Sequence, residues 1–333
     1  MVCILKRGAV RGGPAPQFFV VFLASICLRP GNSTSLGNYL KPGLVTFVVL
    51  KKPLTRRQIL KYGTLSVLGG IIGEALIEPN RLERVTLSVP IKDLPASFEG
   101  FKIGIVSDIH WGHAIDSSYM KMVCDAAISF QPDLMVVPGD FLHGEDRRTH
   151  EKARLDGVIE SLDSPNGVLG VLGNHDHWIG KSYAKDQVYG HSRVQLIDSS
   201  HVTLERKGEL LVIGGVGDLW EGEVDLRKTF RNVDPKTPRI LLSHNPDVAE
   251  VVTGDEETRV DLQISGHTHG GQFVIPGIYD ATNRVSAFGS KFNHGLVNGR
   301  RHQVYVSKGV GRPHGVRFFA PPDVTCLTLI RAA

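Results

Sequence analysis

The feature of this 333-residue sequence that most limits its possible folds is a set of five short polar clusters. Each cluster directly follows a run of residues typical of a β-strand. The clusters are Asp108-Ile109-His110, Gly139-Asp140, Gly173-Asn174-His175-Asp176, His244-Asn245 and Gly266-His267-Thr268-His269-Gly270. The strand-like runs before them are Lys102–Ser107, Leu134–Val137, Val168–Leu172, Arg239–Ser243 and Asp261–Ser265. Ligand sites in α/β sheets lie outside the carboxyl ends of the strands. The order therefore predicts an α/β protein in which the five clusters meet at one site.

Helical and further strand patterns occupy the segments around the clusters. One helix is predicted by apolar residues at helical spacing, namely Tyr119, Met122, Val123, Ala126, Ala127 and Phe130. Another helix is indicated by Val158, Ile159 and Leu162. The tail favours strands at Gln303–Ser307 and Val324–Ile330. We therefore expect a layered α/β catalytic domain over residues 80–333, after a leader over residues 1–79.

The residue types in the clusters predict a metal site. A single histidine is more often a core residue than a ligand, but none of the 14 histidines precedes His110, and five clusters follow strands in order. Alternation places Asp108 and His110 on one face of extended chain, and likewise His267 and His269. Carboxylate, imidazole and amide ligands without thiolate favour Mn, Fe, Zn or Co over Ca or Mg. Two such cations about 3.5–4 Å apart can activate a bridging water for in-line displacement at phosphorus.

The order of the clusters resembles the calcineurin-like metallophosphoesterase superfamily from about Val85 to Ile330. Ser265-Gly266-His267-Thr268-His269-Gly270-Gly271-Gln272 and Leu242-Ser243-His244-Asn245-Pro246 are similar to its bacterial YkuE/YaeI-like branch. The resemblance implies a four-layer α/β/β/α sandwich. It also implies a binuclear phosphoester hydrolase that uses a metal-bridging hydroxide.

The resemblance further implies roles for individual residues. One metal is expected on Asp108, His110 and His269, and the second on Asn174, His244 and His267, with Asp140 bridging the two. His175 is the expected catalytic histidine that binds no metal, and Asp176 is expected to orient it. Arg312 and Arg317 can clamp a substrate phosphate, although plain surface charge explains them equally well. His113, His143 and His177 lie near the expected ligands and either touch substrate or stand in solvated loops.

Two other functions remain open at this point. One is a UDP-2,3-diacylglucosamine pyrophosphatase of lipid A synthesis, in which the aromatic-rich segment Phe273–Phe292 meets acyl chains. Core packing explains that segment equally well, and the nucleotide-linked lipid is cytoplasmic. The other is a metal-binding scaffold without turnover. His175 and Asp176 argue against the scaffold, because neither is needed merely to hold metal.

The leader contains Thr55-Arg56-Arg57-Gln58-Ile59-Leu60-Lys61, which resembles a twin-arginine export signal and precedes the weakly polar Tyr62–Gly73. The alternative is a basic amphipathic helix packed on the domain. The signal predicts recognition by the twin-arginine export machinery and a membrane-associated or extracytoplasmic protein; the other possible location is the cytoplasmic face of the inner membrane. Because such signals normally start a protein, we expect translation to begin near Val48–Leu50. The upstream run Phe18–Leu28 is too short to span a bilayer.

The charge balance indicates the class of partner. A net charge of +4 suits a protein that meets anionic lipid or acts on anionic phosphates. It is too mild to predict a nucleic-acid partner. The expected partners are a phosphoester substrate, including lipid-linked ones, and a membrane surface.

Overall fold

The computed structural model describes residues 20–21, 48–49, 55–144, 154–251 and 258–332. The chain divides into two compact units, Met1–Gly70 and Ile71–Ala333. All five polar clusters belong to the second unit. The expected boundary between leader and catalytic domain after residue 79 stays a prediction.

Helix α1 (Arg56–Ile77) contains the paired arginines and is a single run of 22 residues. By length and composition alone, the segment Arg56–Asn80 is apolar enough to cross a membrane, a test that signal sequences also pass. Upstream, β1 (Val20–Val21) pairs antiparallel with β2 (Val48–Val49). The rest of the apolar runs Phe18–Leu28 and Leu44–Leu50 lies outside the described residues.

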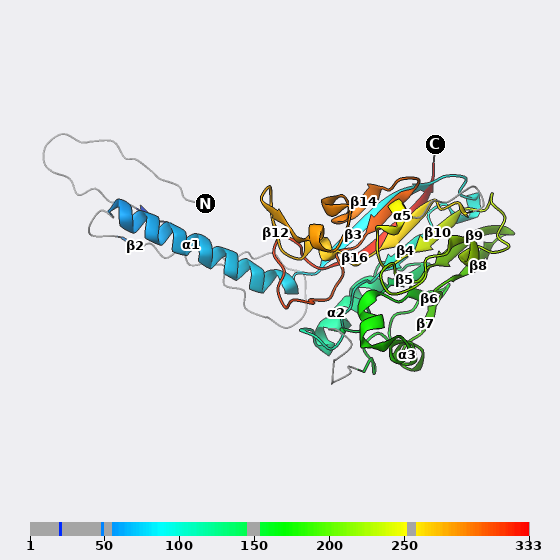
Figure 1. Cartoon of the computed structure of the whole chain (residues 1–333), viewed down its shortest axis with the longest axis horizontal. Coiled ribbons are helices and arrows are strands. Elements are labelled where there is room, and N and C mark those ends of the chain that lie inside the picture. The colour runs from blue at the N-terminus through cyan, green and yellow to red at the C-terminus, as the bar shows by residue number, and fades with distance from the viewer. Residues whose placement is uncertain (1–19, 22–47, 50–54, 145–153, 252–257, 333) are drawn as a thin grey trace, which may run out of the picture. The chain divides into compact units, whose positions relative to one another are not determined.

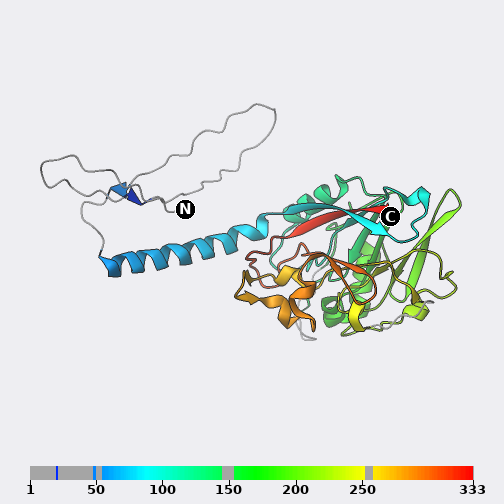
Figure 2. The same cartoon turned by 90° about the horizontal axis from the view of Figure 1, so that it is seen from above.

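Six strands form the first sheet, in the order β3-β16-β4-β5-β6-β7. Their bounds are β3 Glu83–Ile91, β16 Asp323–Arg331, β4 Lys102–Ile105, β5 Leu134–Pro138, β6 Val168–Val171 and β7 Val194–Leu196. Strands β4 to β7 are parallel, whereas β16 runs antiparallel to β4 and parallel to β3. Strands from the two ends of the second unit thus lie side by side (Figure 2).

The second sheet also has six strands, in the order β14-β15-β11-β10-β9-β8. Their bounds are β14 Gly295–Asn298, β15 Gln303–Val306, β11 Leu262–Ser265, β10 Arg239–Leu242, β9 Glu209–Gly215 and β8 Ser200–Arg206. The four inner strands are parallel, and both edge strands are antiparallel to their neighbours. A small hairpin of β12 (Val274–Ile275) and β13 (Tyr279–Asp280) follows β11.

Buried apolar clusters lie between the two sheets and on their outer faces. Figure 1 shows the ribbons of the sheets and helices that carry them. One core cluster fills the space between the sheets, with Ile103 and Val136 from the first sheet and Ile240 from the second. Helices α2 (Ser117–Ile128) and α3 (Asn174–His191) share another cluster with the outer face of the first sheet. Helices α4 (Leu226–Thr229) and α5 (Val248–Val251) cover the outer face of the second. The expected α/β/β/α sandwich is therefore confirmed.

Short 3-10 helices complete the described structure. They are η1 Glu78–Asn80, η2 Ala96–Phe98, η5 His269–Gly271, η6 Ala281–Arg284 and η7 Gly289–Phe292. The strands expected before the five clusters and in the tail are present, with ends shifted by a residue or two. Strands β8 and β9 and helix α3 were not expected from the sequence.

The helix expected at Val158–Leu162 is wrong. This segment consists of turns, in which the amide of Val158 donates to the carbonyl of Leu155 and that of Leu162 to Ile159. Both bonds span three residues, as in turns, and Gly157 directly before the segment has a φ of +68°, which does not belong to a right-handed helix. Val158, Ile159 and Leu162 are nevertheless buried, because these turns place their side chains in the core.

Two neighbouring leucines on β9 test the layered core. Leu211 is fully buried between the sheets, whereas Leu210 is 41% exposed. We expect Leu211→Ala to lower the free energy of unfolding by about 2–5 kcal/mol, through lost burial and the cavity left behind. Leu210→Ala should change it by less than about 0.5 kcal/mol. Urea denaturation measures both, and equal losses would contradict the assignment of faces.

Candidate metal centre

The carboxyl ends of five parallel strands bring the expected ligands together. Strands β4, β5 and β6 of the first sheet lead into one part of the set, and β10 and β11 of the second sheet lead into the rest. All of these side chains are buried, none more than 7% exposed. We call them the candidate centre: Asp108, His110, Asp140, Asn174, His244, His267 and His269.

The first group of the candidate centre consists of Asp108, His110 and His269, whose ligand atoms all lie within 4.8 Å of one another. Nε2 of His110 is 2.9 Å from Nε2 of His269, which is 3.6 Å from Oδ1 of Asp108. The Asp108 carboxylate is held by the hydroxyl of Ser107 at 2.5 Å and the backbone N–H of His267 at 2.7 Å. The bond from His267 joins the loop after β11 of the second sheet to the loop after β4 of the first.

The second group consists of Asn174, His244 and His267. Nε2 of His244 is 3.1 Å from Oδ1 of Asn174 and 3.2 Å from Nδ1 of His267. The other ring nitrogen of each histidine faces a backbone carbonyl oxygen. Nδ1 of His244 is 2.9 Å from the oxygen of Pro138, and Nε2 of His267 is 3.1 Å from the oxygen of Val285. A carbonyl only accepts, so these nitrogens carry the protons. When the rings are neutral, the nitrogens that face the group therefore have lone pairs that a cation can bind.

The carboxylate of Asp140 lies between the two groups. Its Oδ2 is 3.4 Å from Nε2 of His110 and 3.2 Å from Nε2 of His244. Its Oδ1 accepts a hydrogen bond of 2.9 Å from the backbone N–H of His175. One carboxylate oxygen therefore faces both groups, which is the position that a bridging ligand requires.

Charge and burial at the candidate centre suit a cation. Burial raises the pKa of Asp108 to about 6. Burial also acts to raise the pKa of Asp140, but His244 and its other histidine neighbours hold it well below the usual range. In return, against the effect of burial, the Asp140 carboxylate raises the pKa of His244 to about 10. Buried carboxylates need a positive partner. A divalent metal ion between these O and N ligands supplies one, so the residues fit the expected cofactor.

The backbone at the candidate centre is strained. Five of the seven residues have φ between 50° and 72°, a left-handed region that side-chain-bearing residues rarely adopt: Asp108, His110, Asp140, His267 and His269. Strain of this kind is found at functional sites and persists only where the surroundings enforce it. Glycines supply the room: a Cβ on Gly173 would overlap the Asp140 carboxylate, and one on Gly266 that of Asp108.

His175 lies beside the first group, and Asp176 holds the backbone around it. The His175 ring is 4.5 Å from that of His110, and within the described residues its buried Nδ1 has no hydrogen-bond partner. The Asp176 carboxylate accepts from the backbone N–H groups of Gly173 at 3.0 Å and Leu142 at 2.9 Å. Asp176 was expected to orient His175. These bonds fix the backbone at the start of α3, and an orienting role of Asp176 toward His175 stays a prediction.

His143 is a neighbour of the candidate centre that the sequence left undecided. Its Nδ1 is 3.3 Å from Nδ1 of His110, and its ring stacks on those of His175 and His113. His110, His143 and His175 form another group able to hold a metal ion. The sequence signal was its position three residues after Asp140, which also occurs in solvated loops.

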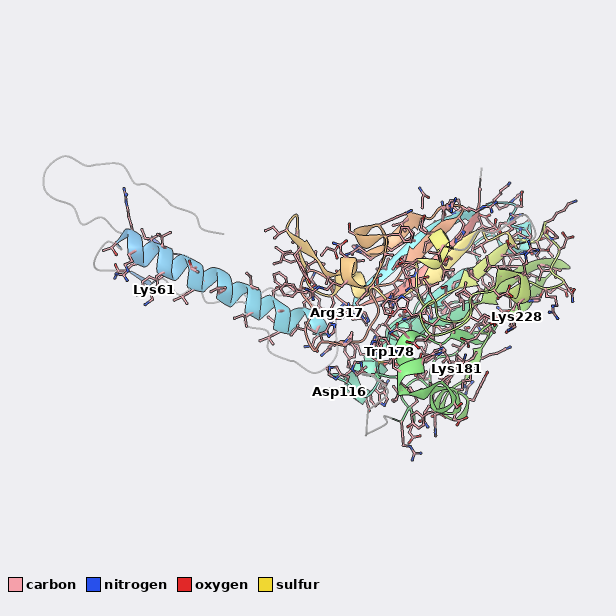
Figure 3. All side chains as sticks on the ribbon, viewed as in Figure 1. Lys61, Asp116, Trp178, Lys181, Lys228 and Arg317 are labelled. Atoms are coloured by element: carbon pink, nitrogen blue, oxygen red, sulfur yellow. The ribbon has the colours of Figure 1, made fainter. Side chains whose placement is uncertain are left out.

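The two arginines proposed for substrate phosphate occupy different surroundings. Arg317 (Figure 3) is fully buried and donates to the carbonyls of Lys308 and Gly311 at 2.9 and 2.7 Å. Its Nη2 is 3.3 Å from Nδ1 of His269. The alternative that Arg317 is plain surface charge is therefore wrong, because the side chain is buried. Its contacts support the loop that packs against His269, and a phosphate-binding role for Arg317 stays a prediction.

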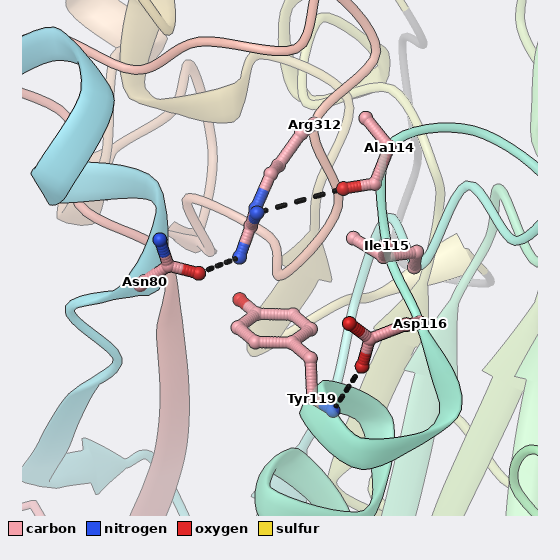
Figure 4. Close-up of a pocket in the computed structure, with 6 residues that line it drawn as sticks. All are labelled: Asn80, Ala114, Ile115, Asp116, Tyr119 and Arg312. Atoms are coloured by element: carbon pink, nitrogen blue, oxygen red, sulfur yellow. Dashed lines mark hydrogen bonds between the residues drawn. The ribbon is translucent and has the colours of Figure 1, made fainter. Parts of the chain in front are cut away.

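Arg312 lies in a pocket lined by Asn80, Ala114, Ile115, Asp116 and Tyr119 (Figure 4). Its guanidinium donates to Oδ1 of Asn80 at 2.8 Å and stands 4.5 Å from the centre of the Tyr119 ring. No residue of the candidate centre lines this pocket. A substrate-binding role for Arg312 therefore also stays a prediction.

Residues 101–271 match the model of the calcineurin-like phosphoesterase family, and this segment contains the whole candidate centre. The chain belongs to this family. The superfamily expected from the sequence is thereby confirmed, and the protein is a hydrolase that acts on phosphoester bonds.

Three relatives of this calcineurin-like phosphoesterase cover most of its length. The uncharacterised metallophosphoesterase YkuE of Bacillus subtilis is 29% identical over 287 residues, 84% of this chain and 98% of the relative. The phosphodiesterase YaeI of Escherichia coli is 29% identical over 233 residues, 69% of this chain and 82% of the relative. The UDP-2,3-diacylglucosamine pyrophosphatase LpxG of Chlamydia muridarum is 24% identical over 304 residues, 74% and 89% of the two chains.

A pair of glycine substitutions tests the packing of the candidate centre. In Gly266→Ala the new methyl group collides with the Asp108 carboxylate and the Ser107 hydroxyl, so we expect loss of bound metal and of phosphoesterase activity. Gly190 lies at the end of α3 with open space around it, so Gly190→Ala should keep both. Metal content by mass spectrometry and thermal unfolding are measured together. Full metal content in folded Gly266→Ala would contradict the geometry of the first group.

Proposed function

We propose that the protein hydrolyses phosphodiester or pyrophosphate bonds with two divalent metal ions, one in each group of the candidate centre. The observation that carries this proposal is the position of Asp140, whose Oδ2 faces His110 on one side and His244 on the other. Metal ions bound there supply an activated water and stabilise negative charge on the phosphate. Mn, Fe, Zn and Co all suit the ligand set.

The chain's own residues prepare this chemistry. When the rings are neutral, the carbonyls of Pro138 and Val285 select the tautomers of His244 and His267 whose lone pairs face the candidate centre. Burial lowers the pKa of His267 to about 3, which keeps its ring neutral and able to bind a cation. His175 is half-buried beside the first group and tied to Asp140 through its backbone. In the proposal, the protonated ring gives its proton to the departing oxygen and is left neutral, a release that burial favours because it lowers the pKa of His175.

A lipid-linked diphosphate is the second candidate substrate. Two observations favour it. One relative is named a UDP-2,3-diacylglucosamine pyrophosphatase. In addition, the segment after β11 exposes apolar side chains, with Ile278 82% and Phe288 40% exposed. A screen of metal-loaded protein against monoesters, diesters and nucleotide-linked lipids separates the candidates.

For location, we propose export by the twin-arginine route and attachment to the membrane. The support is the paired arginines at the start of α1 and the apolar length of that helix. The cytoplasmic face of the inner membrane is the alternative, and it is the one that a nucleotide-linked lipid substrate requires.

The first prediction concerns metal dependence. Hydrolysis of a chromogenic phosphodiester should stop with chelator and return with Mn, Co or Zn. Asp140→Ala should lose both ions, because its carboxylate faces both groups. Asp125→Ala, which removes an exposed carboxylate on α2, should keep them. Activity that persists in metal-free protein would overturn the proposal.

The second prediction concerns His175. A positioned general acid contributes roughly 10²–10⁴-fold, and more when the leaving group is basic. His175→Asn should keep its metal, cleave an alkyl ester far more slowly than wild type, and lose much less on a nitrophenyl ester. Asp108→Asn should slow both esters alike through weaker metal binding. Equal losses on both esters in metal-replete His175→Asn would show that His175 positions phosphate instead.

The third prediction concerns location. The twin-arginine pair is read by a receptor rather than as charge. Replacing Arg56 and Arg57 together by lysine should therefore leave the protein in the cytoplasm, as cell fractionation would show. A matched replacement of Arg227 and Arg231, in the catalytic unit, should not change its location. Export of the Arg56/Arg57 variant at the wild-type level would remove the support for this route.

A further inference from the structure

The loop Gly217–Glu223, which follows β9, has a fixed backbone and presents an exposed tryptophan. Oδ1 of Asp218 accepts hydrogen bonds of 2.9 Å from the backbone N–H groups of both Trp220 and Glu221. The N–H of Gly222 donates back to the carbonyl of Asp218 at 2.8 Å. A Cβ on Gly222 would stand 2.6 Å from the Asp218 nitrogen, so the turn admits no larger residue there. Trp220 is nevertheless 46% exposed.

Two indole rings from distant segments lie side by side at the candidate centre. The ring centroids of Trp220 and Trp178 are 6.4 Å apart, with 28° between the ring planes. Trp178 belongs to α3 (Figure 3), and its Nε1 donates to Oε1 of Glu221 at 2.8 Å, which ties the helix to the loop. We call Trp178 and Trp220 the tryptophan wall.

The tryptophan wall connects the two sides of the candidate centre. Trp220 meets the ring of His267 edge to face, with 4.5 Å between centroids and 86° between planes. Trp178 is 4.6 Å from the ring of His175. One end of the wall thus contacts the second group, and the other contacts the expected general acid.

The construction of the wall indicates binding rather than packing. Neither indole belongs to the buried apolar clusters of the second unit or packs against them as Trp111 does. A half-exposed indole in a rigid loop keeps its face available without further loss of conformational entropy on binding. An aromatic side chain can stack on any nucleobase, because every base has a π face.

We propose that the tryptophan wall is a subsite for a planar heterocycle, such as a nucleobase, carried by the phosphoester whose phosphate lies at the candidate centre. This inference rests on the proposed function, because it assigns the organic part of the same substrate. With such a subsite, esters that carry a nucleobase are better substrates than sugar phosphates of the same charge.

The test separates the contribution of the base from that of the phosphate. Zinc-loaded full-length protein is titrated by calorimetry with the methylene phosphonate analogues of uridine 5′-monophosphate and ribose 5-phosphate, which resist hydrolysis. We expect the base to tighten binding about tenfold, within the range of base–aromatic stacking. In Trp220→Ala the ratio of the two dissociation constants should fall to about one, and Trp220→Phe should restore part of it.

The control is Tyr189→Ala, which removes another exposed aromatic side chain from α3 and should keep the wild-type ratio. Zinc content is measured for each variant, and ratios are compared only between metal-replete proteins. Tight binding of both ligands with a ratio of one in wild type, or an unchanged ratio in Trp220→Ala, would overturn the subsite and leave the proposed function standing. If neither ligand nor inorganic phosphate binds to the zinc-loaded protein, the proposed function fails, and the subsite with it.

Discussion

The buried carboxylates of Asp108 and Asp140 are the constraint on which the rest of the site depends. Asp108 follows a strand of the first sheet but accepts a hydrogen bond from the backbone of His267, which follows a strand of the second. Asp140 likewise faces histidines from both sheets. Two negative charges out of contact with water are stable only with positive partners nearby. The sandwich is therefore arranged so that both sheets deliver imidazoles, and with them a place for cations, to the same point.

This arrangement requires strained backbone conformations in the ligand loops. Left-handed φ angles at Asp108, Asp140 and His267 turn these side chains inward immediately after their strands end. The backbone leaves no space beside these carboxylates, so the contacting positions are glycines. Gly173 contacts Asp140 from the neighbouring strand's loop in the first sheet, and Gly266 contacts Asp108 from the second sheet. Buried Arg317 holds the loop that follows β15 against His269 through backbone carbonyls. Strain in the ligand loops is thus supported by hydrogen bonds from segments that supply no ligand themselves.

Much of the fold and of the expected ligand set follows from local sequence patterns. Strands β4, β5, β6, β10 and β11 are short apolar runs, and each ends in a polar cluster, so both the strand and its functional end are visible in one segment. The turns around Val158 show the limit of this approach, because apolar spacing reports burial and not hydrogen bonding. Strand β8 was missed because five of its seven residues are polar and only Leu204 is buried.

The sequence by itself determined the α/β class, the order of the clusters, the chemistry of the seven expected ligands and the phosphoesterase family. These depend on residue type and on spacing along the chain, which a single segment displays. Only the tertiary structure decided that one oxygen of Asp140 faces both groups, that Asp176 binds backbone amides, that Arg317 is buried, and that Trp178 and Trp220 meet. The contacts of Asp140 with His244 and of Trp178 with Trp220 join segments far apart in the chain. They exist because the two sheets pack face to face and bring their loops to one edge.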